Sequence, residues 1–198
     1  MDRRTEILDC ALHVLAEQGM RGLTHRAVDT AAGIPQGSTS YYFRSRSALV
    51  TGCVERILEL DLTIEALSVS AVRADACALV DSLVDIAVSL VTTQRYRTLA
   101  RYELSLAAMR DPQLQAALMR AGDTVRAFGA EMLQGLGAAD AGRSIEELLA
   151  MLDGLLFTML VRGQQDPCTL AAQLRPSVER AVRAQLSARA VARDTMEP

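Results

Sequence analysis

The chain has 198 residues, half of them hydrophobic, and a formal net charge of −3. This length can bury a sizeable core in one or two domains, and no apolar run approaches the ~18 residues of a transmembrane helix. The N-terminus carries no secretory apolar segment, so the sequence predicts a cytoplasmic protein without a membrane span.

The first predicted helix covers residues 3–18 and is amphipathic. His13 lies at i, i+4 spacing from Asp9 and Glu17, which favours a solvated partner of carboxylates over a metal ligand. Gly19 ends the helix. Apolar positions at helical spacing predict a buried stripe formed by Ile7, Leu8, Ala11, Leu12, Val14 and Leu15.

Residues 23–49 predict two short helices joined by a tight turn. Thr24 is a predicted N-cap, Gly33 suits a turn with positive φ, and Pro35 helps to restart the chain. The next residues offer hydroxyl groups, an amide and almost no aliphatic bulk: Gln36, Gly37, Ser38, Thr39, Ser40, Tyr41 and Tyr42. A short helix with this surface suits the second helix of a helix-turn-helix, which lies in the DNA major groove.

This stretch resembles the DNA-binding domain of TetR/AcrR-family transcriptional regulators over residues 3–50. The resemblance is carried by Gly22-Leu23-Thr24, Ala32-Gly33-Ile34, Gly37, Tyr41-Tyr42-Phe43 and Ser45-x-x-x-Leu49. The chain departs from the family pattern at four places: Asp29 replaces a small apolar residue, Pro35 a Ser or Thr cap, Thr39-Ser40 a bulkier pair, and Arg46 a Lys.

The resemblance implies residue roles at a DNA interface. Bases would be read around Gly37 by Gln36, Ser38, Thr39, Ser40 and Tyr41. The DNA backbone would be contacted by Thr24, His25, Arg26, Tyr42, Arg44 and Arg46. For His25 an exposed polar role is the alternative, and the sequence leaves open which of the two tyrosines contacts DNA. Residues 1–50 hold six Arg and five acidic residues, so local placement rather than total charge would supply phosphate contacts.

Helices dominate the remainder of the chain. Phe43 is predicted to fill the small three-helix core, and Ser45 caps a long helix. Residues 67–75 read as a connection, and further helices are expected over residues 75–94 and 96–109. The next helix starts at Asp111-Pro112, and residues 135–142 form a loop.

The C-terminal part contains an unusually apolar helix. Residues 144–147 form a capping box, and residues 148–161 are apolar nearly all round. Residues 163–167 are predicted to interrupt the helix. A short helix then extends to Leu174, and Pro176 starts the last helix. The apolar helix needs a second cover, for which a second copy is the natural candidate. The resemblance likewise implies a homodimer, through helices at about 144–162 and 169–190.

These elements predict an all-α fold of about nine or ten helices. A three-helix helix-turn-helix domain would cover residues 1–48. A helical effector-binding and dimerisation domain would cover residues 49–190, and residues 191–198 would form a disordered tail.

The resemblance also implies a pocket for a small-molecule effector. The proposed lining is Arg101, Tyr102, Glu103, Met109, Phe128, Asp153 and Phe157. Asp153 interrupts an apolar helix, where an unpaired carboxylate would be unfavourable. It would therefore pair with an Arg across the dimer or bind the ligand.

No enzyme, metal site or cofactor is predicted, because the chain lacks a phosphate-binding glycine loop, a nucleophile motif and clustered His or Cys residues. The four cysteines read mainly as small core residues. We expect a homodimeric repressor that a small effector releases from a pseudo-palindromic double-stranded DNA operator. An activator or a ligand-free repressor stays open. The alternative of another class is a helical ligand-binding or interaction protein that has lost specific DNA binding.

Overall fold

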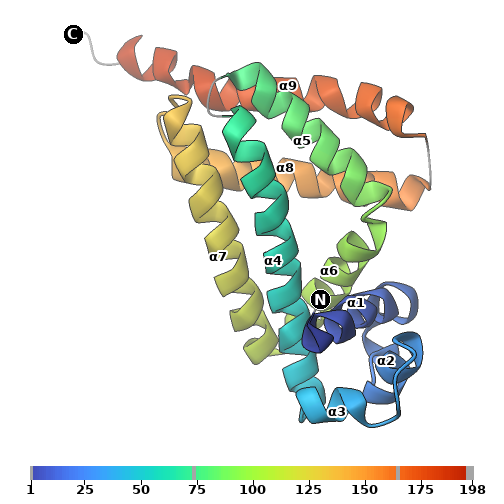
Figure 1. Ribbon diagram of the computed structural model, residues 1–198. Helices are drawn as coiled ribbons and strands as arrows, with labels where there is room; N and C mark the ends of the chain where they lie inside the picture. Colours follow the sequence, from blue (N-terminus) through green and yellow to red (C-terminus); the bar gives the residue numbers. More distant parts are fainter. Residues whose placement is uncertain (1, 73–74, 164–165, 195–198) are drawn as a thin grey trace. The chain divides into compact units, whose positions relative to one another are not determined.

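The computed structural model describes residues 2–72, 75–163 and 166–194 of the chain (Figure 1). These ranges contain helices and no strand, which confirms the predicted all-α fold. The helices are α1 (Arg3–Gly22), α2 (His25–Ala31), α3 (Ser38–Tyr42), α4 (Arg46–Val72), α5 (Ala76–Val91), α6 (Arg95–Ala108), α7 (Pro112–Gly135), α8 (Ala141–Arg162) and α9 (Pro167–Asp194).

The chain divides into two compact units, and α4 and α7 contribute to both. The first unit contains Met1–Leu62 and Gln94–Asp123, and the second contains Thr63–Thr93 and Thr124–Pro198. The compact unit that holds the helix-turn-helix therefore also includes α6 and the first half of α7. The domain boundary predicted after residue 48 assigns these two helices to the C-terminal domain instead.

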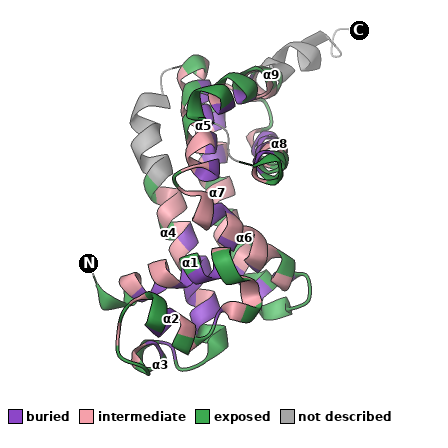
Figure 2. Cartoon of the chain, turned by 90° about the vertical axis from the view of Figure 1, so that its right-hand side faces the viewer, coloured by how far each residue is buried: buried purple, intermediate pink, exposed green. Residues whose placement is uncertain are grey.

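The first unit has a continuous core built on α1. The six apolar residues predicted to form the stripe of α1 are all buried (Figure 2). Phe43 is 2% exposed and belongs to this core, as predicted, together with Leu49 and Cys53 of α4 and Leu104 of α6. Gly52 of α4 has no Cβ to accommodate, and a Cβ there would lie 2.8 Å from the Phe43 ring. The short helices are thus anchored to a preformed apolar surface.

The second unit packs α5, α8, α9 and the second half of α7 together. Leu79 and Val84 of α5 are buried with Leu133 of α7 and Leu148 of α8. A neighbouring cluster joins α5 to Leu156 of α8 and to α9. Carboxylates cap helix starts in both units: Asp111 of the first unit accepts hydrogen bonds from the first turn of α7, as predicted, and Asp140 of the second unit accepts one from Arg143 N.

Several helix boundaries differ from the predictions. Helix α4 extends through residues predicted as a connection and ends at Val72. Helix α8 starts at Ala141 rather than at the predicted capping box, because Asp140 supplies the cap and Ser144 is buried one turn inside.

Helix α9 also runs unbroken across Pro176. A stripe repeating every four residues, with Leu170, Leu174, Val178 and Val182 buried, compensates for the hydrogen bond that proline removes. The backbone helix continues to Asp194, beyond the predicted start of the disordered tail, and residues 195–198 lie outside the described ranges.

No single helix in the described ranges is long and apolar enough to span a membrane. Ala76–Val91 and Arg95–Ala108 reach that length and composition only when they are taken together, and the helix is interrupted between them.

Candidate nucleic-acid interface

The turn between α2 and α3 has the local geometry that the sequence predicts. Thr24 caps α2, its hydroxyl accepting a hydrogen bond of 3.1 Å from Ala27 N. Gly33 has a φ of 63° and Gly37 a φ of 96°, both in the left-handed region that favours glycine. A Cβ at either glycine would meet nothing within 4 Å, so backbone conformation rather than space selects glycine there.

Asp29 holds the N-terminus of α3 from within the domain. Its side chain is 1% exposed, and its two carboxylate oxygens accept hydrogen bonds of 2.7 Å from Gly37 N and 2.8 Å from Thr39 N. Burial alone would raise the pKa of Asp29, but the hydrogen bonds from Thr39 and Gly37 and the nearby His25 lower the pKa below its ordinary value. A buried carboxylate thus caps the five-residue helix.

In the sequence, Asp29 stands out only as a departure from the family pattern. An acidic residue on α2, shortly before a glycine and a short polar helix, was the available signal. Its meaning depends on the tertiary contact between α2 and α3, which the sequence alone did not reveal.

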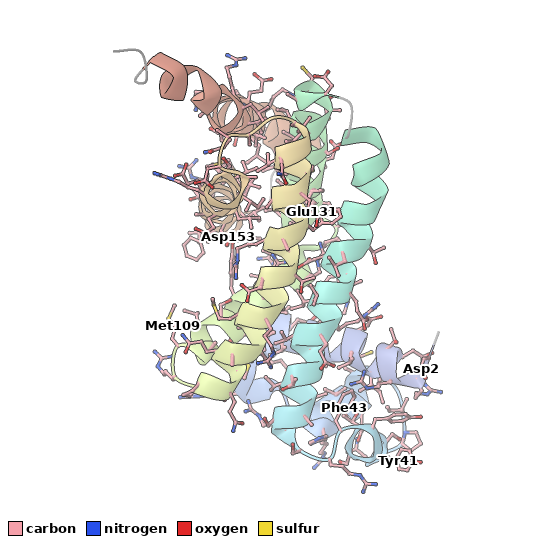
Figure 3. All side chains as sticks on the ribbon, turned by 90° about the vertical axis from the view of Figure 1, so that its left-hand side faces the viewer. Asp2, Tyr41, Phe43, Met109, Glu131 and Asp153 are labelled. Atoms are coloured by element: carbon pink, nitrogen blue, oxygen red, sulfur yellow. The ribbon has the colours of Figure 1, made fainter. Side chains whose placement is uncertain are left out.

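Most of the predicted DNA-contacting side chains lie at the surface. Tyr41 is 71% exposed and Tyr42 40% exposed, their rings in an edge-on contact with centroids 5.3 Å apart, whereas Phe43 points inward (Figure 3). Ser38 is half-buried and donates a hydrogen bond to Pro35 O. The other exposed residues of the predicted set are Thr24, Arg26, Gln36, Gly37, Ser40, Arg44 and Arg46.

Three residues of the predicted set have partners inside the domain. Thr39 is 0% exposed and faces the core as the second residue of α3, so its side chain is not available to DNA bases in this conformation. His25 Nε2 lies 2.7 Å from Phe43 O and must donate, because a carbonyl oxygen only accepts. Arg46 donates from Nε to Leu23 O at 3.1 Å and from Nη2 to Met20 O. These side chains position the helices.

The residues predicted to line an effector pocket are divided between the two units. Arg101 binds both oxygens of Asp61, at 2.8 and 2.9 Å, and Glu103 accepts a hydrogen bond of 3.1 Å from Met20 N. Tyr102 is half-buried beside them in sequence, and Met109 is 75% exposed. All four lie in the first unit.

The remaining three candidates belong to the second unit. Phe128 is half-buried on α7, whereas Asp153 and Phe157 of α8 are both exposed. Figure 3 shows the position of Asp153 on α8. In the single chain Asp153 is exposed, so an ion pair across a dimer and a ligand contact both stay predictions for its carboxylate.

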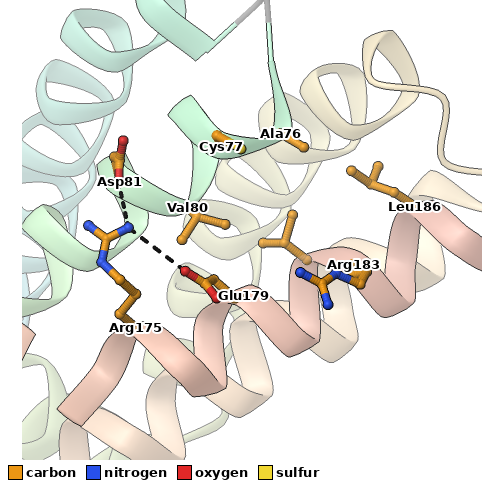
Figure 4. A pocket seen from close by; sticks show the side chains of 9 residues that line it. Ala76, Cys77, Val80, Asp81, Arg175, Glu179, Arg183 and Leu186 are labelled. Atoms are coloured by element: carbon orange, nitrogen blue, oxygen red, sulfur yellow. Dashed lines mark hydrogen bonds and ion pairs between the residues drawn. The ribbon is translucent and has the colours of Figure 1, made fainter. Parts of the chain in front are cut away.

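The second unit has a groove elsewhere, between α5 and α9. It has a volume of about 490 Å³, and its rim carries Arg175, which pairs with Asp81 at 2.7 Å and with Glu179 at 4.0 Å (Figure 4). None of the predicted effector-binding residues lines it.

Among the described residues, no group of three His, Cys, Asp or Glu side chains is placed to hold a metal ion. All four cysteines are free thiols. Cys53 is a core residue, and burial raises the pKa of its thiol to about 12. Cys77 and Cys168 are exposed, so the core assignment does not hold for them.

Comparisons with known proteins agree with this arrangement. Residues 7–53 match the family model described as bacterial regulatory proteins of the tetR family, and residues 74–188 match the tetracyclin repressor-like C-terminal domain. The HTH-type transcriptional repressor KstR2 of Rhodococcus jostii (strain RHA1) is 40% identical over 57 residues. That match spans 29% of this chain and only 28% of the relative.

Solved structures extend the similarity to nearly the whole chain. A member of the TetR family from Streptomyces coelicolor A3 is 26% identical, with a TM-score of 0.68, over 91% of this chain and 98% of that one. The multidrug binding protein EbrR, solved in complex with imidazole, is 26% identical, with a TM-score of 0.63, over 91% and 95% of the two chains. Since the family models cover both the helix-turn-helix and most of the remaining chain, the protein belongs to the TetR family of bacterial transcriptional regulators, which are DNA-binding proteins and not enzymes.

Proposed function

We propose that the protein is a cytoplasmic, homodimeric repressor that binds a pseudo-palindromic operator and is released by a small-molecule effector. The observation that carries this proposal is the division of α3 into two faces. Thr39 is buried and its N–H is held by Asp29, while Ser40 and Tyr41 are exposed. A rigidly capped helix that presents hydroxyl and aromatic groups outward is suited to the major groove.

The exposed residues divide into two roles. Gln36, Ser38, Ser40 and Tyr41 would contact base edges, with Gly37 allowing close approach of the backbone. Thr24, Arg26, Tyr42 and Arg44 would contact phosphates and set the register of the domain on the duplex. Because Tyr41 is 71% exposed and Tyr42 only 40%, Tyr41 is the tyrosine proposed to reach into the groove.

Dimerisation is proposed through α8 and α9. Helix α8 buries Leu148, Leu152 and Leu156 within its own unit but leaves Phe157 58% and Val161 71% exposed. A large apolar side chain and a branched one, four residues apart on one helix face, favour burial against the same face of a second copy. Two recognition helices would then lie about one DNA turn apart, or a multiple of it.

Release by an effector is supported by a relative. EbrR, which has a similar fold, is named as a multidrug binding protein and was solved with imidazole bound. An effector that binds preferentially to one arrangement of the dimer would shift the population away from the DNA-binding arrangement.

The test starts with selection of random duplex DNA on the purified full-length protein. The selected sequence is then titrated by fluorescence anisotropy at several salt concentrations, with a shuffled duplex as control. A palindromic consensus, bound by one dimer with a steep salt dependence, is the expected result. A folded dimer that enriches no sequence and binds both duplexes equally would contradict the proposal and favour a ligand-binding protein without specific DNA binding.

A further inference from the structure

Arg97, near the start of α6, is a buried cation without a matched partner. Its side chain is 2% exposed, and its Nε has no hydrogen-bond partner in the described part of the chain. The nearest carboxylate oxygen is Asp61 Oδ1 of α4, 3.6 Å from Nη2, which is too far for a hydrogen bond. Burial lowers the pKa of the guanidinium, and the neighbouring Arg101 lowers it further, while Asp61 partly opposes both effects.

Asp61 is already occupied by another residue. Both of its oxygens accept hydrogen bonds from Arg101, at 2.8 and 2.9 Å. Two guanidinium groups thus share one carboxylate, and one positive charge stays uncompensated although the Arg97 side chain is only 2% exposed. Buried cations in proteins are ordinarily paired, since an unpaired charge in a poorly solvated environment is strongly unfavourable. The arrangement therefore lacks one negative charge and a hydrogen-bond acceptor for Arg97 Nε, both of which an additional anion would supply.

The chemistry of the missing partner follows from the donors and their surroundings. Guanidinium groups bind the planar or tetrahedral oxygens of carboxylates and phosphates with two parallel hydrogen bonds. Ile57, Ala100 and Leu104, which are close to the pair in sequence, are buried apolar residues of the same unit. We propose that Arg97 and Arg101 bind the acidic head group, a carboxylate or a phosphate, of an effector whose remainder is apolar.

This inference rests on the proposed function as an effector-released repressor and assigns a chemical class to the effector. It also indicates a route to the DNA-binding helices. The Asp61–Arg101 pair joins α4 to α6, and both helices hold the peptide groups just before α2: Glu103 of α6 binds Met20 N, and Arg46 of α4 binds Met20 O. An anion that binds Arg101 in place of Asp61 would remove the ion pair between α4 and α6 and weaken the two contacts at Met20.

The experiment measures binding of simple probes to the full-length protein by isothermal titration calorimetry. Octanoate and octyl phosphate carry the two acidic head groups on the same apolar chain, and octanol is the uncharged control. Wild type is expected to bind at least one of the two acids about tenfold or more tightly than octanol. Preference for octanoate or for octyl phosphate identifies which oxyanion the site takes.

Two variants and a control test the residues. Arg97→Met, which keeps the length and removes the charge, is expected to abolish the preference for the acid while the protein stays folded, because a buried unpaired charge is removed. Asp61→Asn removes the competing carboxylate and is expected to tighten binding of the acid by about tenfold. Arg110→Met removes an exposed charge just after α6 and is expected to bind like wild type.

The results separate this inference from the proposed function. Equal binding of octanol and the acids, no binding of any probe, or an Arg97→Met variant that keeps the preference would each overturn the anion site. Binding that follows the prediction without any release of selected operator DNA would leave the anion site standing and contradict the effector role. Normal operator binding by a protein indifferent to the acids would leave the regulator standing and remove the anion site.

Discussion

Replacement of Asp29 is the sharpest test of how the recognition helix is held. In Asp29→Ala, Gly37 N and Thr39 N lose the carboxylate oxygens that lie 2.7 and 2.8 Å away. In Asp29→Asn, one oxygen acceptor is kept and the second becomes an NH₂ group that cannot accept. The two variants therefore remove different numbers of hydrogen bonds at one buried site.

The expected magnitudes follow from these contacts. Loss of a capping side chain costs about 0.5–2 kcal/mol, and a hydrogen bond to a charged acceptor contributes about 1.5–3 kcal/mol. Alanine also removes the unfavourable burial of the carboxylate, so we expect a net loss of about 2–3 kcal/mol for Asp29→Ala and about 1–2 kcal/mol for Asp29→Asn. A helix of five residues has little stability of its own, so operator affinity should fall with the cap, by about tenfold for alanine.

Urea unfolding at pH 7 measures the free energy of unfolding, and anisotropy measures operator affinity. Glu17→Ala, which removes an exposed carboxylate from α1, is the matched control and should change neither. The pKa of Asp29 is lowered on folding from its ordinary value of 3.8, so its contribution is complete above that value and is lost as the pH falls through the lower folded pKa. The difference between wild type and Asp29→Asn should be constant from about pH 5 to 8 and shrink below about pH 4.

A free energy of unfolding for Asp29→Ala within about 0.5 kcal/mol of wild type, with an unchanged denaturant slope, would contradict the capping role of Asp29. A difference in free energy of unfolding between wild type and Asp29→Asn that does not depend on pH across the acid range would contradict it as well.

Three further predictions concern the DNA interface and the dimer. Arg26→Ala should weaken binding equally on selected and shuffled DNA and reduce the salt slope by about 1, whereas Ser40→Ala should change the selected sequence. The same titrations with both duplexes separate these outcomes. A loss of affinity for Arg26→Ala that depends on the DNA sequence would contradict its assignment to a phosphate contact. Thr39→Val should leave the selected sequence unchanged when the selection is repeated on the variant, because the side chain of Thr39 is 0% exposed and faces the core; a new consensus would place Thr39 in the base-reading set. Val161→Asp should yield monomers in light scattering and Met109→Asp, a change at another exposed apolar residue, should not, so a dimer that tolerates aspartate at position 161 would exclude this face of α8.

The parts of the fold that were predictable depend on local periodicity and turn chemistry. The buried stripe of α1, the Thr24 cap and the left-handed glycines follow from residues close in sequence, and the structure confirms them. The family was also identifiable, because its motifs fall in a fixed register over the first fifty residues. Such features need no knowledge of which helices meet.

The parts that were missed depend on contacts between helices. The burial of Thr39 is not visible in the sequence, because a five-residue helix has no periodicity from which to tell its buried face from its exposed face. The local sequence predicts a helix start at Pro176, because it does not reveal that α9 packs against α5. This packing allows α9 to continue through Pro176. Nothing in the sequence distinguishes Arg97, because its burial beside an already paired Asp61 depends on how α4 and α6 pack.

The division of α3 between two faces has a consequence for how binding specificity changes in such a protein. Asp29 and Thr39 hold the helix and are buried, whereas Gln36, Ser40 and Tyr41 are exposed. Exchanging the exposed set alters which sequence is read but removes almost no buried surface, so a library randomised there should consist mainly of folded proteins. New operator preferences are thus accessible by single substitutions, without first acquiring compensating mutations in the core.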